Sequence, residues 1–524
     1  MDTSERDQLE KAAEGFATQI GVPYFDTRPH IDIKPLIGKL TVIGMEAYGI
    51  VPVAIDGNKL TIGTSEETDR GQLESLRHRL AGYQVEFVFI SQFGWNRIFN
   101  RFTIANNLDI LESGDFSAIN QELLNLEPKF MFEPLAQLAY QLGASDIHIE
   151  PAEHDARIRF RIDGTLHPIT VLPKDRYDLF ASDLQMRAGV KWGGDVPQGG
   201  RVSLNVIDDE GDTTQLNMRL ETIPSLHGED VVIRLFNLSV KYLTLDNLQL
   251  SPHHREVLLR SVSHPRGMVM TVGPTGSGKT STLYSIMNHL NNPEIKIVTL
   301  EDPIEYELTG ISQVPVRSDD QQLFMEKLRA VLREDPNIIM IGEIRDADTA
   351  KTALQAALTG HLVLSTFHAT NASAAISRLM DMIGENPLLA SSVKLIMAQR
   401  LLRRLCNECK ISESATKEEL LNVKTALDGL NADAHPSIEN LQLARPVGCD
   451  ACHHFGYRGR IYILEQLEIT KKMEALIAKG TAITSESIEE AAKKDGMVTL
   501  LQDGIIKALN GQTTLEEVYT QVGE

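Results

Sequence analysis

The eight residues Gly273–Thr280, with the sequence GPTGSGKT, constrain the fold of this chain more than any other feature. They fit the pattern G-x-x-x-x-G-K-[ST], follow the apolar run 268–272 directly and lead into a helical pattern from Ser281 onward. In such a loop the glycines let backbone N–H groups turn inward around phosphate oxygens at a helix N-terminus. The sequence therefore predicts an α/β domain that binds a nucleoside triphosphate.

The chemistry of this pattern assigns roles to two side chains. Lys279 supplies a cation to the phosphates, and the Thr280 hydroxyl is a ligand for Mg²⁺. We therefore expect ATP and Mg²⁺ as cofactors. The candidate nucleotide-binding residues are Gly273, Pro274, Thr275, Gly276, Ser277, Gly278, Lys279, Thr280 and Ser281.

Near-continuous apolar runs at 268–272, 295–300, 338–341 and 362–366 alternate with helical stretches. This alternation is typical of a parallel sheet with crossover helices, buried on both faces. Ligands of such sheets lie at the carboxyl ends of the strands. The polar side chains expected there are Glu301, Asp302, Glu305, Glu343 and His368.

Glu343 is our preferred Walker-B acid, which would hold the Mg²⁺ shell or orient the attacking water. The sequence does not divide these duties among Glu343, Glu301 and Glu305. His361 and His368 could contact the γ-phosphate, and a structural role for each histidine is the alternative.

Length and charge limit the other possibilities. The 524 residues allow several domains, and 51 Lys and Arg against 72 Asp and Glu give a net charge of −21, which disfavours generic nucleic-acid binding. No stretch approaches the ~20 apolar residues of a membrane span, and residues 1–7 lack the form of a signal peptide. We expect a cytosolic protein.

Upstream of the nucleotide loop, strands dominate from about 128 to 240. In the strand Arg157–Ile162, period-two alternation places three arginines on one face. That strand alone leaves open whether this face is merely solvated or binds a ligand.

All four cysteines occur in two Cys-x-x-Cys pairs, Cys406/Cys409 and Cys449/Cys452. Four thiolates suit one tetrahedral Zn²⁺ with a full coordination shell, which indicates a structural site. A redox pair is the alternative, and His453 or His454 could replace one sulfur.

Several segments together resemble the secretion ATPases that power type II secretion and type IV pilus assembly. Leu300–Tyr306 resembles the aspartate box of that family, Met340–Asp346 its Walker-B segment and Thr359–His368 its histidine box. Ala144–Glu150 and Arg161–Gly164 resemble the start of the second N-terminal domain.

The resemblance implies a homo-hexameric ring in which ATP binds between the second N-terminal domain and a RecA-like domain. Arginines of the N-terminal domain would complete the site, and by position these are Arg201, Arg219 and Arg234, with Arg161 as a further candidate. The family usually has Pro-Gln-Asp-Gly-Arg where this chain has Gly199 in place of the aspartate.

The resemblance also implies partners. The N-terminal domain would dock to a membrane-associated protein and the motor would act on an inner-membrane platform protein, at the inner face of the cytoplasmic membrane. Some relatives bind cyclic di-GMP through a Leu- and Gly-rich motif. Residues 1–20 do not show that motif, so we expect no cyclic di-GMP binding. The tetracysteine pattern favours the assembly or secretion branch over pilus retraction.

The fold class expected is multidomain α/β, with a RecA-like P-loop core, α+β N-terminal domains and a zinc-binding tetracysteine subdomain. The predicted domains are an N-terminal docking domain (1–105), a linker (106–127), a second β-rich N-terminal domain (128–240), a RecA-like ATPase domain (241–400), a tetracysteine zinc subdomain (401–470) and a C-terminal helical domain (471–524).

Three functions remain to be compared. The leading hypothesis is a hexameric cytoplasmic ATPase that converts hydrolysis into mechanical work, with domain closure about a hinge near 237–250. The alternatives are a RecA-type nucleic-acid translocase, which lacks a basic and aromatic binding strip, and a scaffold that binds ATP without hydrolysing it, against which Glu343 and Lys279 argue.

Overall fold

A computed structural model describes most of residues 3–523. The residues left out are scattered positions between 30 and 81, most of 113–125 and of 431–439, and the segments 192–194, 208–212, 237–242, 318–319 and 481–482. Most of the predicted linker and the start of the predicted hinge thus lie outside the described residues. The chain divides into two compact units, Met1–Asn237 and Leu238–Glu524, which we describe separately.

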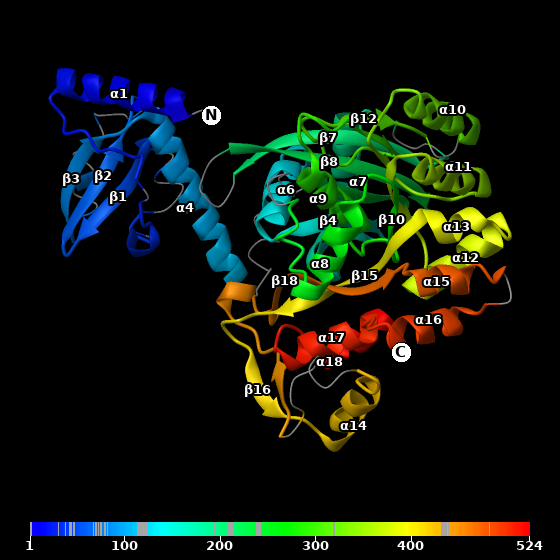
Figure 1. The fold of residues 1–524 in the computed structure, drawn as a ribbon. Helices are drawn as coiled ribbons and strands as arrows, with labels where there is room; N and C mark the ends of the chain where they lie inside the picture. The colour runs from blue at the N-terminus through cyan, green and yellow to red at the C-terminus, as the bar shows by residue number, and fades with distance from the viewer. Residues whose placement is uncertain are drawn as a thin grey trace. The chain divides into compact units, whose positions relative to one another are not determined.

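The first part of the N-terminal unit is a small α+β fold with a three-stranded sheet in the order β1-β2-β3 (Figure 1). The short segments 60–63 and 85–89 lie within strands β2 and β3. Helix α4 runs beyond residue 105, where the sequence suggested a domain boundary. The elements are α1 (Thr3–Ile20), η1 (Lys34–Leu36), β1 (Ile50–Asp56), β2 (Lys59–Thr64), β3 (Gln84–Phe89) and α4 (Gln92–Glu112).

The second part of this unit is a six-stranded antiparallel sheet in the order β6-β5-β4-β9-β8-β7. Helices α6 and α7 pack on the sheet face that carries the buried apolar residues. The other face carries the alternating arginines. The elements are η3 (Pro128–Phe130), α6 (Phe132–Gln141), β4 (Ala144–Pro151), β5 (Asp155–Ile162), β6 (Thr165–Pro173), α7 (Lys174–Ala188), β7 (Gln198–Ile207), β8 (Thr213–Ser225) and β9 (Gly228–Phe236).

The C-terminal unit is built on a seven-stranded sheet in the order β12-β11-β13-β14-β10-β15-β18. All neighbours are parallel except β15 and β18. The strand predicted at 338–341 has these bounds in the structure. The strand predicted at 295–300 begins two residues later in the structure, at Ile297. The strands are β10 (Gly267–Val272), β11 (Ile297–Glu301), β12 (Ser312–Pro315), β13 (Ile338–Ile341), β14 (Leu362–Phe367), β15 (Val393–Leu405) and β18 (Tyr457–Glu468).

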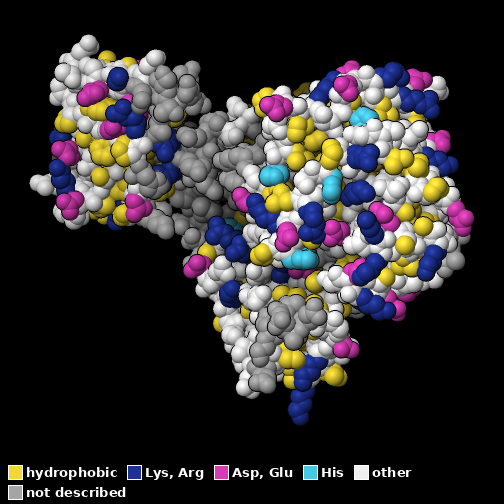
Figure 2. Space-filling model, viewed as in Figure 1, with side chains coloured by type: hydrophobic (Ala, Val, Ile, Leu, Met, Phe, Trp, Pro, Cys, Tyr) yellow, Lys and Arg dark blue, Asp and Glu magenta, His cyan; other side chains and the backbone are white. Residues whose placement is uncertain are grey.

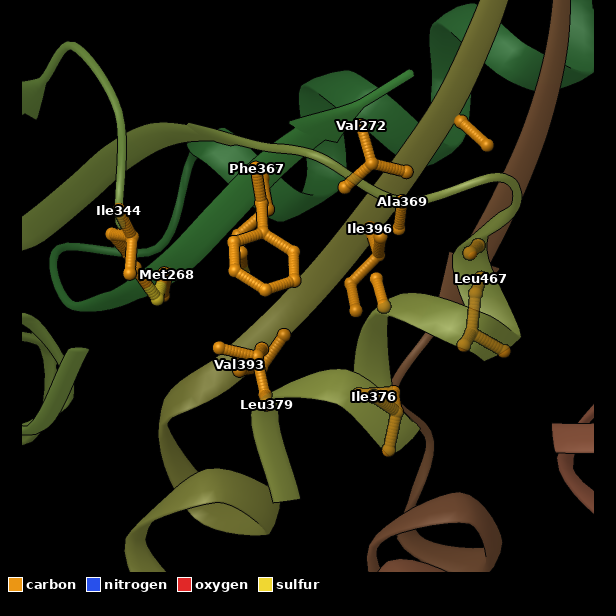
Figure 3. Packing of buried hydrophobic residues seen from close by; sticks show 14 of the residues in the cluster. Met268, Val272, Ile344, Phe367, Ala369, Ile376, Leu379, Val393, Ile396 and Leu467 are labelled. Carbon is orange, nitrogen blue, oxygen red and sulfur yellow. The ribbon is translucent and has the colours of Figure 1, made fainter. Parts of the chain in front are cut away.

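Both faces of this sheet are covered, as the near-continuous apolar strands predicted. Along β10 alternate residues enter different clusters: Val269 packs with α8 and α9, whereas Met268, Met270 and Val272 pack with helices of the other face (Figure 3). The helices are α8 (Pro252–Val262), α9 (Lys279–Leu290), α10 (Gln321–Leu332), α11 (Ala347–Leu358), α12 (Ala372–Ile383) and α13 (Pro387–Ser392).

The rest of the chain extends this unit with the two-stranded sheet β16–β17, which the cysteine pairs flank in sequence, and with the C-terminal helices. Residues 514–517, at the start of α18, form half of a capping box. The Thr514 hydroxyl accepts from the Glu517 N–H, but the Glu517 carboxylate binds Arg403 instead of returning to the cap. The elements are β16 (Ile411–Ser414), α14 (Lys417–Ala426), β17 (Gln442–Arg445), η6 (Asp450–Cys452), α15 (Lys471–Ile477), α16 (Ser485–Lys494), α17 (Leu500–Leu509) and α18 (Leu515–Val522).

Candidate nucleotide site

The phosphate-binding loop lies between β10 and α9, as its sequence pattern predicted. Gly276 and Gly278 have φ angles of 80° and 84°, a left-handed conformation that favours glycine. Helix α9 begins at Lys279, so its first N–H groups face the loop. The Lys279 ammonium donates to the carbonyls of Gly273 (2.9 Å) and Pro274 (2.8 Å), and burial lowers its pKa.

The carboxyl ends of the parallel strands bring the other predicted side chains to the same edge of the sheet. Glu343 follows β13, Glu301 ends β11 and His368 follows β14. His361 precedes β14 and is therefore at the opposite edge. Its Nδ1 lies 3.0 Å from the Ala356 carbonyl, which gives this histidine a structural contact.

Glu343 is held by two basic side chains. Its carboxylate accepts from Arg345 Nε at 2.5 Å and lies 2.8 Å from His368 Nε2. It also attracts the Lys279 ammonium electrostatically, which opposes the effect of burial on the pKa of that lysine. The side chain remains 19% exposed, so it can exchange these partners for a bound ligand or water.

A cavity of about 360 Å³ opens beside Glu343 at the ends of β13 and β14. Helix α12 contributes Arg378, which donates to the His368 carbonyl and stacks over the Phe367 ring at 5.5 Å. The cavity is lined by Glu343, Ile344, Arg345, Phe367, His368, Arg378 and Met382. Sequence reasoning missed Arg345 and Arg378, although Arg345 lies within the quoted Walker-B segment.

Glu301 has different surroundings from Glu343. It is buried, and its two oxygens accept from Thr299 Oγ1 (2.5 Å), Gln313 Nε2 (3.1 Å) and the Tyr284 hydroxyl. Burial and the neighbouring carboxylate raise the pKa of Tyr284. These contacts join the end of β11 to α9. Glu305 lies in the segment between β11 and β12 and is exposed.

The arginines selected by resemblance form a row across the sheet of the N-terminal unit. Arg201, Arg219 and Arg234 are register partners on β7, β8 and β9, so all three side chains are on one sheet face. Arg219 pairs with Glu221 at 2.5 Å. Within the described part of the chain, no carboxylate lies within ion-pair distance of Arg201.

Asp146 continues this row on β4. It is opposite Arg234, whose Nε donates to it at 3.1 Å, and opposite Arg161, whose Nε lies at 3.5 Å. The row thus has four guanidinium groups and one buried carboxylate. Because the apolar residues of these strands point to the helix-covered face, the row lies on the open face.

The four cysteines come together after β15 and around η6. Their sulfur atoms all lie within 4.8 Å of one another, and the Cys406–Cys449 and Cys409–Cys452 separations are 3.9 and 3.8 Å. Four ligands at the usual Zn–S distance of about 2.3 Å would be about 3.8 Å apart in a tetrahedron. Backbone N–H groups also point at the sulfurs, for example Gly448 to Cys409 at 3.3 Å. The donor set therefore fits a zinc ion.

A glycine-rich phosphate loop, a parallel sheet and acidic and basic side chains at the carboxyl edge define a RecA-like P-loop ATPase. The family model described as type II/IV secretion system protein matches residues 125–520, and the MshEN domain model matches 20–105. The chain belongs to the type II/IV secretion system protein family, and it is an ATP hydrolase of the class that serves secretion and pilus systems.

Curated relatives agree with this assignment over nearly the whole chain. The chain is 36% identical to the type IV pilus assembly ATPase PilB of Pseudomonas aeruginosa over 97% of its length and 89% of the relative. It is 39% identical to type II secretion system protein E of Aeromonas hydrophila over 95% and 92%. Identity to PilB of Thermus thermophilus is 35% over 98% of this chain, which spans 58% of that relative.

A solved structure supports the fold. The ATPase DotB of Legionella pneumophila aligns with 75% of this chain and 95% of its own at a TM-score of 0.54 and 20% identity. At that identity the likeness concerns the fold alone.

Proposed function

We propose that this ATPase works as a homo-hexameric motor for type IV pilus assembly or type II secretion, and that it cleaves ATP when the second N-terminal domain closes over the phosphate loop. The observation that carries this proposal is the arginine row Arg201–Arg219–Arg234. The proposal keeps the domain division predicted from the sequence, with 128–240 as the arginine-bearing domain and 241–400 as the ATPase domain.

The row supports an anionic ligand on electrostatic grounds. Neighbouring strands are about 4.8 Å apart, so three in-register guanidinium groups repel one another. Asp146 and Glu221 compensate Arg234 and Arg219 in part, whereas Arg201 has no ion pair among the described residues. A triphosphate would supply the missing negative charge, and a guanidinium can stabilise the charge of the transferring phosphoryl group.

The residues at the carboxyl edge of the sheet would have separate roles in binding and cleaving ATP. The loop N–H groups and Lys279 would bind the phosphates, and Thr280 would hold Mg²⁺, which neutralises phosphate charge. Glu343 would leave Arg345 and His368 to orient the attacking water or the Mg²⁺ shell. His368 would then be free to contact the γ-phosphate. Glu301, fully engaged by protein donors, would support the loop helix from behind.

The tetracysteine cluster would bind one structural zinc ion. Its four sulfur ligands complete a tetrahedral shell, so the ion would stabilise the region after β15 and leave no open position for catalysis. By resemblance this cluster favours assembly or secretion over retraction.

The partners and the location are part of this proposal and are supported by the family. The N-terminal residues 1–105 would dock to a membrane-associated protein, and the ring would act on an inner-membrane platform protein at the cytoplasmic face. Among the described residues, no helix is long and apolar enough to cross a membrane. The expectation that cyclic di-GMP does not bind stays a prediction.

Nucleic acid is not an expected partner. The net charge is −21, and on the face drawn in Figure 2 basic and acidic side chains are interspersed over the described residues. Stimulation of the ATPase by single-stranded DNA at low salt would favour the translocase alternative instead.

The test compares Arg201→Gln and Arg219→Gln with Arg157→Gln. Arg157 lies on the same open face of β5 but outside the row, so it is a matched control. We expect the first two changes to lower kcat by about 100-fold or more while the Kd for ATP changes little, because the arginines act on the transition state. The control should keep full activity.

Native mass spectrometry with and without nucleotide measures the proposed hexamer. Equal activity of all three variants, or a monomer under every condition, would contradict the proposal.

A further inference from the structure

Arg400 is a buried arginine on β15 that the sequence patterns did not single out. It lies two residues beyond Ala398, which pairs with Val272 at the end of β10. Only 8% of the residue is exposed. Its guanidinium donates to the carbonyls of Gln399 (3.0 Å) and Thr370 (2.7 Å), and no carboxylate of the described residues lies within ion-pair distance. Such burial is costly for a cation and lowers the pKa of Arg400.

The guanidinium lies directly against the phosphate loop. A Cβ atom placed on Gly273, the first residue of the loop, would be 3.2 Å from Arg400 Nη1. The preceding residue, Gln399, donates to the Ser277 carbonyl at 2.8 Å. Strand β15 therefore hydrogen-bonds the loop through Gln399, and the Arg400 guanidinium beside Gly273 is close enough to Lys279 to disfavour the charged form of that lysine.

The second contact of Arg400 leads to the catalytic edge. Thr370 comes two residues after His368, whose ring lies 2.8 Å from the Glu343 carboxylate. The loop that follows β14 is thus tied to Arg400 at one residue, while Arg378 binds the carbonyl of His368 itself. One guanidinium thus lies beside the phosphate loop at Gly273 and hydrogen-bonds the segment that follows His368 at Thr370.

We propose that Arg400 is a positioning residue that couples occupation of the phosphate loop to the placement of His368 beside Glu343. The planar guanidinium can donate along two fixed directions at once, whereas a lysine ammonium at this position cannot reproduce both contacts. The proposal rests on the proposed hydrolytic role of Glu343 and His368. It assigns to Arg400 no contact with the reacting atoms.

Hydrogen exchange measured by mass spectrometry tests the coupling without turnover. A non-hydrolysable ATP analogue should protect both 273–280 and 366–372 in the unmodified chain. In Arg400→Lys the phosphate loop should keep its protection, and 366–372 should lose most of it. Equal protection of 366–372 in both proteins would overturn the role of Arg400. If the analogue protects neither segment of the unmodified chain, the nucleotide site itself is wrong and the proposed function falls with it.

Kinetics give a second readout. We expect Arg400→Lys to lower kcat about tenfold with the Kd for ATP within about twofold, and its effect to shrink when His368→Ala is also present, because coupled residues are not additive. Arg403→Lys is the structural control: Arg403 is a half-buried arginine on the same strand that binds Glu517. It should lower the melting temperature without coupling to His368. Strictly additive effects of Arg400→Lys and His368→Ala on kcat would refute the proposal.

Discussion

Replacing Glu301, at the end of β11, by alanine should mainly lower stability, whereas the same change at Glu343, after β13, should mainly abolish turnover. Glu301→Ala removes the acceptor of three donors, the hydroxyls of Thr299 and Tyr284 and the Gln313 amide. A buried donor left without a partner costs about 1–3 kcal/mol. If two of the three stay unsatisfied, the C-terminal unit loses about 3 kcal/mol, or about 6–12 °C in melting temperature for a domain of this size.

Glu343→Ala is the matched change on the neighbouring strand end. Its partners Arg345 and His368 are about half exposed and can turn to water, so the melting temperature should shift by less than about 2 °C. The Glu343→Ala variant should nevertheless lose ATP turnover.

Differential scanning fluorimetry and a phosphate-release assay on both variants separate the two roles. If Glu301→Ala melted like the parent protein and still bound ATP without turning it over, Glu301 would be the catalytic carboxylate. The assignment of that role to Glu343 would then be wrong.

Three further outcomes are expected. Lys279→Ala should abolish binding of a fluorescent ATP analogue and ATP hydrolysis together; retained turnover would refute the phosphate-loop assignment. Elemental analysis should find one zinc per chain, and Cys409→Ser should lower both the zinc content and the melting temperature; an unchanged metal content would disprove the site. Burial raises the pKa of Glu465, so the stability from its protonated form is present at low pH and is lost as pH rises through that raised pKa. Relative to the parent, the melting temperature of Glu465→Gln should therefore rise as the pH increases above about 4.5; a difference that does not change with pH would contradict this.

The sheet edge could be predicted because its signals are local. A strand buried on both faces is a continuous apolar run, and 338–341 therefore appears in the sequence with its observed bounds. The phosphate loop is equally local, since its glycines, lysine and helix start lie within eight residues. The spacing of each cysteine pair is local too, although only the fold brings Cys406 and Cys449 to 3.9 Å.

The different surroundings of Glu301 and Glu343 could not be predicted, because two of the donors that surround Glu301 come from other elements of the fold. Each residue lies at or just after the end of an apolar strand, so the two look alike in the sequence. Tyr284 and Gln313 reach Glu301 from α9 and β12, and only the packing of those elements shows that its oxygens are already used. The same reason hides Arg400, whose neighbours Gly273 and Thr370 lie 127 and 30 residues earlier in the sequence.

The arginine row could not be predicted from the separate sequence segments, because it depends on the register in which β7, β8 and β9 pair. Resemblance selects Arg201, Arg219 and Arg234 one at a time, as residues of three separate segments. The hairpin pairings β7–β8 and β8–β9 place them opposite one another, and Asp146 extends the row on β4. A row of like charges on an open face is unfavourable unless an anion binds there. In the motor that we propose, relief of this repulsion would favour closure of the arginine-bearing domain over a triphosphate, and this contribution should weaken as the salt concentration rises.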